Sequence, residues 1–261
     1  MKLSFNSTVL AVAVSLSSIL STQDVRAVIT YDLKTDWSDV SNPNGVWSYK
    51  EGTNLLPHVA AWDPTEVGGT QPAWAISGSL SSGELDPAWF KSTIRPLFSH
   101  DWLIGDVVTH TTDENGTGNG PANVTWTSPL NGTVDISGVV WMGRDVFRSN
   151  HWTLSLNGVP LTGGDISSGD TFNRASPFNF AAGSSGASVL NDVPVTIGDV
   201  ITLQIVKTST IGDFAGVNFT IDAVPEPSSF ALCAIAAAAL GIGLRRKTSR
   251  PMVTVTKTLR G

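Results

Sequence analysis

Apolar and polar residues alternate along most of the chain between residues 120 and 224. Apolar side chains recur at every second position in five segments, and mostly Thr, Ser, Asp, Asn or Gln stand between them. The alternating positions are Val124 and Trp126; Val134, Ile136 and Val140; Trp152, Leu154 and Leu156; Ile201, Leu203 and Ile205; and Val217, Phe219 and Ile221. This period of two is typical of antiparallel strands with one buried face and one wet face.

Turn residues separate these segments. Asn157-Gly158 is the clearest turn, because both residues accept the positive φ of a tight hairpin. Gly198-Asp199 opens the next strand, and the segment 128–132 separates two others. No helical period is visible in the central region. Short strands with turn-rich connections predict an all-β domain at residues 28–224, an antiparallel β-sandwich.

The N-terminus has the pattern of an export signal. Lys2 precedes the apolar stretch 9–20, which is too short to span a membrane, and Val25 and Ala27 supply compact residues at the −3 and −1 positions of a cleavage site. We therefore predict a signal peptide at residues 1–27, with cleavage after Ala27.

The C-terminus combines an extended motif, an apolar run and a basic cluster. The prolines of Val224-Pro225-Glu226-Pro227 hold the backbone extended and present Glu226. The uncharged run 228–244 would extend about 26 Å as a helix, slightly less than the roughly 30 Å of a hydrocarbon core. Arg245, Arg246 and Lys247 follow it. We predict a transmembrane helix here, rather than a buried helix of a soluble domain, and a short cytoplasmic tail at residues 248–261.

The order of these parts at residues 224–247 resembles the PEP-CTERM sorting signal of Gram-negative-type bacteria. The resemblance implies recognition of Pro225-Glu226-Pro227 by exosortase, a membrane protease-transpeptidase. It also implies a precursor anchored in the inner membrane and then delivered to the cell surface or extracellular matrix. One departure is the continuation of the chain for 14 residues beyond the basic cluster.

A second resemblance covers most of residues 30–224, apart from a poorly matched stretch at 64–103. The segments that carry this resemblance are 42–49, 124–134, 156–158, 197–201 and 216–221. They look like a jelly-roll domain that recurs in PEP-CTERM proteins and is similar to carbohydrate-binding sandwiches. The resemblance implies a fold rather than an activity.

Charge and cysteine content narrow the possible partners. Residues 28–226 carry 8 Lys and Arg against 21 Asp and Glu, a net charge of −13. Such an acidic domain is not expected to bind nucleic acid, whereas neutral glycans, cations and basic partners remain compatible with it. The single cysteine, Cys233, lies in the apolar run. We therefore expect the exported domain to have no disulfide and to depend on a packed core or a bound metal for its stability.

Tryptophan is abundant, and all nine tryptophans fall between residues 37 and 152. An indole can fill a core or stack on the apolar face of a sugar. We expect Trp126 and Trp152, which lie in alternating strands, to be buried. Five others remain candidates for glycan contact as well as for core packing, because loops in a Pro- and Gly-punctuated region or a strand end could display them: Trp62, Trp74, Trp89, Trp102 and Trp141.

Catalytic and metal signals are weak. The four histidines lack the short spacing of metal ligands. The acidic, Gly-rich segment 113–120 is either a solvated loop or a weak Ca²⁺ site, and Arg144, Asp145 and Arg148 are expected to form an exposed ion-pair cluster. We expect no enzyme activity and no cofactor other than this possible Ca²⁺. The functional classes, in order of expectation, are a non-catalytic surface or matrix protein, a polysaccharide-binding module and a secreted hydrolase.

Overall fold

Two antiparallel sheets pack face to face in the domain. A computed structural model describes residues 27–64, 68–78, 87–96, 100–112 and 120–226. The strands are β1 (Ile29–Asp32), β2 (Trp47–Glu51), β3 (Asn54–Leu55), β4 (His58–Trp62), β5 (Gln71–Ala75), β6 (Ala88–Lys91), β7 (Val107–His110), β8 (Ala122–Thr127), β9 (Gly132–Met142), β10 (Ser149–Leu156), β11 (Val159–Ser167), β12 (Phe178–Asn179), β13 (Val193–Val195), β14 (Val200–Lys207) and β15 (Phe214–Pro225). Two short 3₁₀ helices, η2 (Phe180–Ala182) and η3 (Ala187–Leu190), follow β12.

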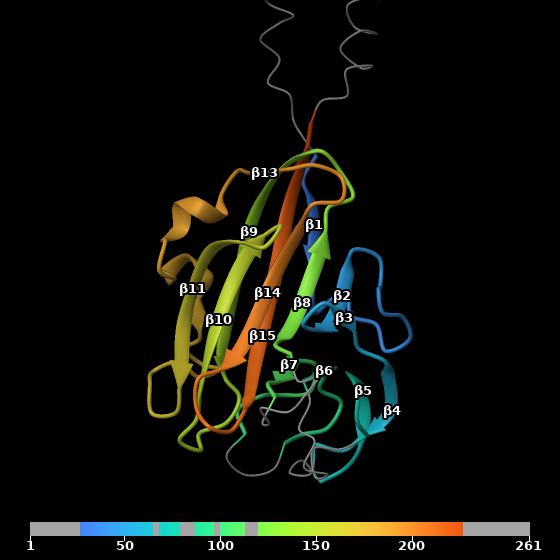
Figure 1. The fold of residues 1–261 in the computed structure, drawn as a ribbon, viewed down its shortest axis with the longest axis vertical. Coiled ribbons are helices and arrows are strands. Elements are labelled where there is room, and N and C mark those ends of the chain that lie inside the picture. The colour runs from blue at the N-terminus through green and yellow to red at the C-terminus, as the bar shows by residue number, and fades with distance from the viewer. Residues whose placement is uncertain (1–26, 65–67, 79–86, 97–99, 113–119, 227–261) are drawn as a thin grey trace, which may run out of the picture. The chain divides into compact units, whose positions relative to one another are not determined.

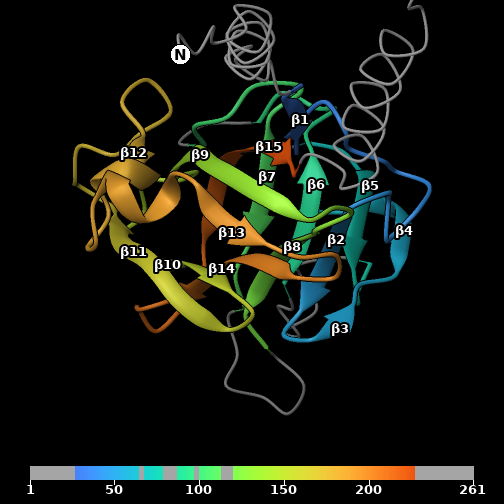
Figure 2. The same ribbon diagram turned by 90° about the horizontal axis from the view of Figure 1, so that it is seen from above.

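The two sheets form the two layers seen from above in Figure 2. The larger sheet has the order β12-β9-β15-β7-β6-β5-β4, with β1 also paired to β15 and β13 also paired to β9. The smaller sheet has the order β11-β10-β14-β8-β2-β3. Figure 1 shows β9, β10, β14 and β15 running along the long axis of the domain. This arrangement confirms the predicted antiparallel sandwich.

The strands predicted from alternation are all present. They correspond to β8, β9, β10, β14 and β15, and their alternating apolar side chains enter the core between the sheets, where Trp126 and Trp152 are fully buried. The Asn157-Gly158 turn is confirmed as well, with φ of 50° and 79° at its two residues. Aromatic side chains fill the centre of this core: the rings of Trp47 and Phe219 lie 5.3 Å apart, and those of Trp152 and Phe180 lie 5.1 Å apart.

The sequence is compatible with either core packing or display on loops for the four candidate tryptophans between residues 54 and 105, and the structure shows core packing. That region contributes β3 to β6, and Trp62, Trp74, Trp89 and Trp102 are 0 to 3% exposed. Trp74 and Trp89 join the main core, whereas Trp62 and Trp102 pack with Phe90 and Phe214 in a second cluster of buried residues. Because β5 and β6 send side chains into both clusters, they lack the alternation of a half-buried strand.

Trp141 is also buried rather than displayed. It is 1% exposed, its Nε1 donates a hydrogen bond to the carbonyl oxygen of Asp101 at 2.7 Å, and its ring lies over Gly216 of β15. A methyl group at Gly216 would lie 2.0 Å from Cε2 of Trp141. Stacking on a sugar requires an open indole face, so none of the five candidate tryptophans can provide this contact in the folded domain.

The Gly216–Trp141 contact gives a first prediction. Replacing Gly216 by Ala should lower the free energy of unfolding by about 2 kcal/mol or more, because the new methyl group overpacks a buried site. Gly78→Ala is the matched control, since no atom lies within 4 Å of the position that its methyl group would occupy. Urea unfolding of both variants is the measurement, and equal midpoints would contradict the prediction.

Candidate functional site

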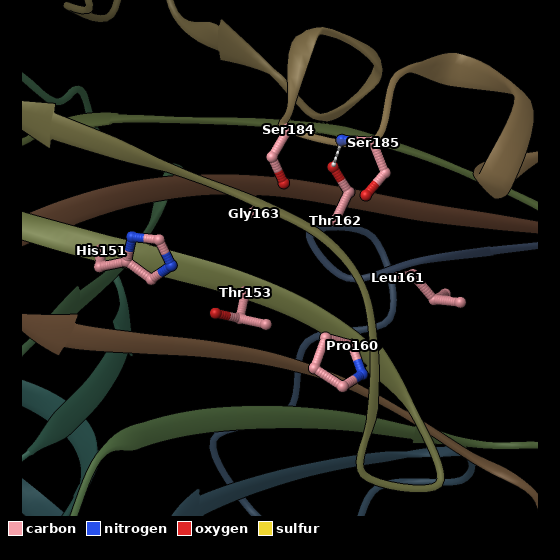
Figure 3. A pocket seen from close by; sticks show the side chains of 8 residues that line it. All are labelled: His151, Thr153, Pro160, Leu161, Thr162, Gly163, Ser184 and Ser185. Carbon is pink, nitrogen blue, oxygen red and sulfur yellow. Dashed lines mark hydrogen bonds between the residues drawn. The ribbon is translucent and has the colours of Figure 1, made fainter.

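A hollow on the described surface lies on the outer side of the β10–β11 hairpin (Figure 3). Its volume is about 270 Å³. The lining residues are His151 and Thr153 of β10, Pro160, Leu161, Thr162 and Gly163 of β11, and Ser184 and Ser185 of the loop that follows η2. We call this hollow the hairpin pocket.

Two glycines allow the pocket to form. Gly163 faces Thr153 across the hairpin, and a methyl group there would lie 2.6 Å from the carbonyl oxygen of Trp152 and 3.3 Å from Nε2 of His151. A methyl group on Gly183 would lie 2.3 Å from the hydroxyl oxygen of Thr162. The missing side chains therefore leave space beside the imidazole and let the 183–185 loop approach β11.

Backbone hydrogen bonds hold the loop against the hairpin. The N–H of Ser184 donates to the carbonyl oxygen of Gly163 at 2.9 Å, and the N–H of Ser185 donates to Oγ1 of Thr162 at 3.3 Å. Figure 3 shows this second bond and the hydroxyls of Ser184 and Ser185 above the hairpin. The pocket wall is therefore positioned by the main chain, while the hydroxyls of the two serines are not needed to build it.

His151 is the titratable side chain of the pocket. Its Nδ1 lies 2.7 Å from Oδ1 of Asp165, its cross-strand neighbour on β11. A carboxylate acceptor requires a proton on Nδ1, so the neutral imidazole presents Nε2 as a hydrogen-bond acceptor. Both side chains are substantially exposed, at 43% and 74%. The pair therefore orients an accessible acceptor beside the space left by Gly163.

Phe147 lies just before β10 and is an unusual surface residue. Its side chain is 99% exposed and its φ is +60°, a conformation that costs a bulky residue free energy. The hydroxyl oxygen of Ser168 accepts hydrogen bonds from the N–H groups of Val146 and Arg148, at 2.9 and 3.1 Å. These contacts fix both neighbours of Phe147, so the surrounding structure maintains the strained conformation.

Polar side chains connect the hairpin pocket with this loop. Thr153, His151 and Ser149 lie at alternate positions of β10, and Ser149 pairs with Ser167 of β11. Their intervening neighbours Asn150, Trp152 and Leu154 are buried. We call Ser149, His151, Thr153, Asp165 and Ser167 the polar track; it spans about 13 Å of strand at 3.3 Å per residue.

The most buried carboxylates form hydrogen bonds and ion pairs that hold distant segments together. Asp106 accepts hydrogen bonds from Nε of Arg174 at 2.5 Å and from Nζ of Lys34 at 3.1 Å, which joins three distant segments. Burial by itself would raise the pKa of Asp106, but the hydrogen bonds from Arg174, the N–H of Leu103 and Lys34 together lower it. Asp213 lies 3.9 Å from Arg148, which also donates to the carbonyl oxygen of Gly212.

A buried polar cluster around Thr111 adjoins His110, whose ring packs 4.8 Å from that of Phe214. Thr111 donates to Oδ1 of Asn150 at 2.9 Å and accepts from the N–H of Asp213 at 3.0 Å, and His110 is the neighbour of Thr111 in the chain. Burial, with nearby Arg148 and Arg144, lowers the pKa of His110 to about 3. At 3% exposure His110 is inaccessible to a ligand and remains neutral in the folded protein at neutral pH.

His110 makes stability depend on pH. The unfolded chain takes up a proton below its pKa of about 6.5, whereas the folded chain does not until about pH 3. This contribution is complete above pH 6.5 and is lost as the pH falls. We expect the free energy of unfolding to decrease by about 2 kcal/mol between pH 6.5 and 5.

The His110→Gln variant provides the comparison, because glutamine does not titrate. Its unfolding free energy, measured by urea titration over the same range, should change much less. This window lies above the carboxylate range, so aspartates with lowered pKa contribute little to the slope. Parallel pH profiles for the two proteins would show that His110 is not the source.

Only some of the residues of the predicted sorting and export signals lie in the described part of the chain. Val224 and Pro225 form the end of β15, and Glu226 is exposed directly after it. Ala27 is exposed two residues before β1. Pro227, Arg245, Arg246 and Lys247 lie outside the described residues, as do most of the predicted signal peptide, the segment 228–244 and the tail 248–261. No helix in the described part of the chain is long and apolar enough to cross a membrane.

The possible Ca²⁺ loop also lies largely outside the described residues, since only Gly120 of the segment 113–120 is described. Its N–H donates to Oε1 of Glu51 at 2.7 Å. Elsewhere in the described ranges, no group of three or more His, Cys, Asp or Glu residues is arranged to hold a metal ion. The Ca²⁺ site stays a prediction.

Sequence reasoning missed the hairpin pocket and Phe147. The Asn157-Gly158 turn suggested the pairing of β10 with β11, but a register shift between Leu154 and Ser155 changes which residues face each other. The loop carrying Ser184 and Ser185 comes from an irregular segment without a periodic signal. Phe147 lies inside the predicted Arg144–Arg148 cluster, and its positive φ has no signature in the sequence.

Comparison with known proteins identifies the C-terminal motif. Residues 223–247 match the family model described as the PEP-CTERM protein-sorting motif. A search of curated proteins found no match to the chain. The motif confirms the predicted sorting signal: the chain is an exported, exosortase-targeted precursor that is anchored in the membrane through its C-terminal region and processed to the cell surface or extracellular space.

Proposed function

We propose that the exported sandwich is a non-catalytic surface or matrix protein that binds a neutral polysaccharide in the hairpin pocket. The observation that carries this proposal is the lining of the pocket. Thr153, Ser184 and Ser185 offer hydroxyls, His151 offers an oriented acceptor, and Pro160 with Leu161 offers an apolar edge. Sugars present the same combination of hydroxyl groups and apolar C–H faces.

Charge favours a neutral ligand over an acidic one. The net charge of −13 on residues 28–226 repels anionic polymers, and Asp165 adds a local negative charge beside the pocket. With the candidate tryptophans buried, Phe147 at the end of the polar track is an exposed aromatic ring in the described part of the chain that is available for stacking on a sugar. A polymer is the ligand class that can reach both the pocket and Phe147.

The loop geometry favours binding over hydrolysis. A His–Asp pair near two serines resembles part of a nucleophilic site, but acyl transfer also requires free N–H donors for the oxyanion. The N–H groups of Ser184, Ser185 and Gly186 already donate to Gly163, Thr162 and Gly183. Because these N–H groups are already used within the loop, they are not free to stabilise an oxyanion, which supports a binding role for the loop over a catalytic one.

Removal of the pocket hydroxyls tests the proposal. The double variant Thr153→Val and Ser184→Ala should weaken binding about tenfold or more, since each lost hydrogen bond contributes roughly 0.5–1.5 kcal/mol. Ser137→Ala, on an exposed position of β9, is the control. Binding would be measured by calorimetry and affinity electrophoresis with dextran, a neutral β-glucan and the cells' own matrix polysaccharide, and with alginate as an acidic comparison.

If the wild-type protein retains none of these polymers, the binding proposal fails and a purely structural or adhesive role is left. Turnover of any glycan that disappears in His151→Gln would contradict the non-catalytic part. Equal binding by the double variant and the wild type would remove the hairpin pocket from the proposal.

Phe147→Asn separates binding from stability. Asparagine tolerates positive φ better than phenylalanine, so the variant should be more stable by up to about 1 kcal/mol. The same change removes the stacking ring and should weaken binding of long polymers. Thermal unfolding and affinity electrophoresis measure the two effects; a variant that gains stability and keeps full affinity would exclude Phe147 from the binding surface.

A further inference from the structure

The sorting motif begins inside the folded sandwich. Val224 and Pro225 are the last residues of β15 and pair with Thr133 and Gly132 of β9. The chain divides into two compact units between Pro225 and Glu226, within the Pro-Glu-Pro sequence itself. The first proline therefore belongs to the sheet, and Glu226 is the first residue of the motif beyond it.

Gly132 makes this pairing possible. A methyl group on Gly132 would lie 2.1 Å from the carbonyl oxygen of Val224, 3.0 Å from its carbonyl carbon and 3.1 Å from Cα of Pro225. Backbone atoms cannot move aside as the end of a flexible side chain can. On the other edge of β9, Val195 of β13 pairs with Gly132. Any larger residue must therefore displace the end of β15 or part of the β9–β13 pairing.

The residues before the motif are held even more firmly. Ala223 pairs with Val134 of β9 on one side and with Ile29 of β1 on the other. It is fully buried, Val224 and Pro225 are half-buried, and Glu226 is exposed. A peptide that binds by strand addition needs a free backbone edge. Residues Thr220 to Ala223 of β15 therefore have no free backbone edge, because β9 and β1 pair with them from both sides, and the chain first becomes exposed at Glu226.

We propose that Gly132 is a positioning residue for the sorting reaction. By holding Val224 and Pro225 in the sheet, it restricts exosortase to the motif from Glu226 onward, so every cut lies C-terminal to Pro225. The cut breaks one peptide bond, transfers the acyl group on its N-terminal side to water or an amine, and releases the downstream peptide with a free amine. The mature domain retains Pro225 and its complete last strand.

Mass spectrometry of the mature C-terminus in cells that contain the exosortase tests this proposal. Every wild-type product should retain Pro225, and a wild-type product ending at Val224 or earlier would overturn the proposal. In Gly132→Ala the freed end of β15 should yield additional products that are shorter by one or more residues and end upstream of Pro225.

Gly138→Ala is the matched control for general destabilisation. Gly138 lies on the same strand, and its added methyl group would lie 2.3 Å from the carbonyl oxygen of Asn218, well before the motif. It should reduce the amount of folded protein without moving the cut. If both variants give the same shortened products, unfolding explains them; if neither does, enzyme specificity alone sets the site. Either result overturns the role of Gly132.

A second variant keeps the proposal testable if Gly132→Ala does not fold. Inserting Ser-Gly-Ser-Gly between Ala223 and Val224 leaves the sheet residues up to Ala223 and the motif from Val224 onward unchanged, but moves the motif away from β9. We expect products that end upstream of Pro225 in this variant. An unchanged cut C-terminal to Pro225 would contradict the proposal, because the sheet could no longer restrict the enzyme.

Discussion

The close pairing of β9 with β15 is the constraint on which the rest of the structure depends. Eleven consecutive residue pairs join the two strands, from Met142 with Ala215 to Gly132 with Pro225. Glycine occurs where the strands or their covering side chains come closest: Gly132 against Val224, Gly138 against Asn218 and Phe180, and Gly216 against Trp141. The same three glycines therefore allow the two backbones to approach closely and allow the rings of Phe180 and Trp141 to pack against them.

Other elements take their positions from this pair. β7 and then β1 pair along the edge of β15 that faces away from β9, and β12 and β13 pair along the edge of β9 that faces away from β15. The inward side chains of β15, including Phe219, meet Trp47 from the smaller sheet. In a domain whose cysteine lies outside the sandwich, this aromatic packing supplies stability that disulfides supply in many small exported domains.

The sequence predicted the second half of the fold much better than the first. β8, β9, β10, β14 and β15 each bury one face, so alternation revealed them. β5 and β6 are buried on both faces by different clusters, and the runs Ala73-Trp74-Ala75 and Ala88-Trp89-Phe90 carry no period of two. The same double burial explains why the tryptophans of this region are not exposed. The turn-rich sequence around them is compatible with tryptophans on surface loops, whereas in the structure a second cluster of buried residues covers the outer face of these strands.

The site was less predictable than the fold, because it depends on contacts between distant segments. Motif order alone revealed the sorting signal, since its parts are contiguous. The hairpin pocket instead requires a register shift in β10–β11, two missing side chains and a loop about twenty residues further along the chain. No local pattern specifies that combination, and a strained φ such as that of Phe147 follows from Ser168, again a distant partner.

The Phe147 loop and the sorting motif lie toward opposite ends of one strand. Arg148, the neighbour of Phe147, donates to the carbonyl oxygen of Gly212, two residues before β15 begins, whereas the sorting motif starts where β15 ends. Twelve residues of strand separate these points by roughly 40 Å. Processing beyond Pro225 therefore takes place far from the Phe147 loop, so the exposed ring at this end of the proposed binding surface is separated from the cut by the length of β15.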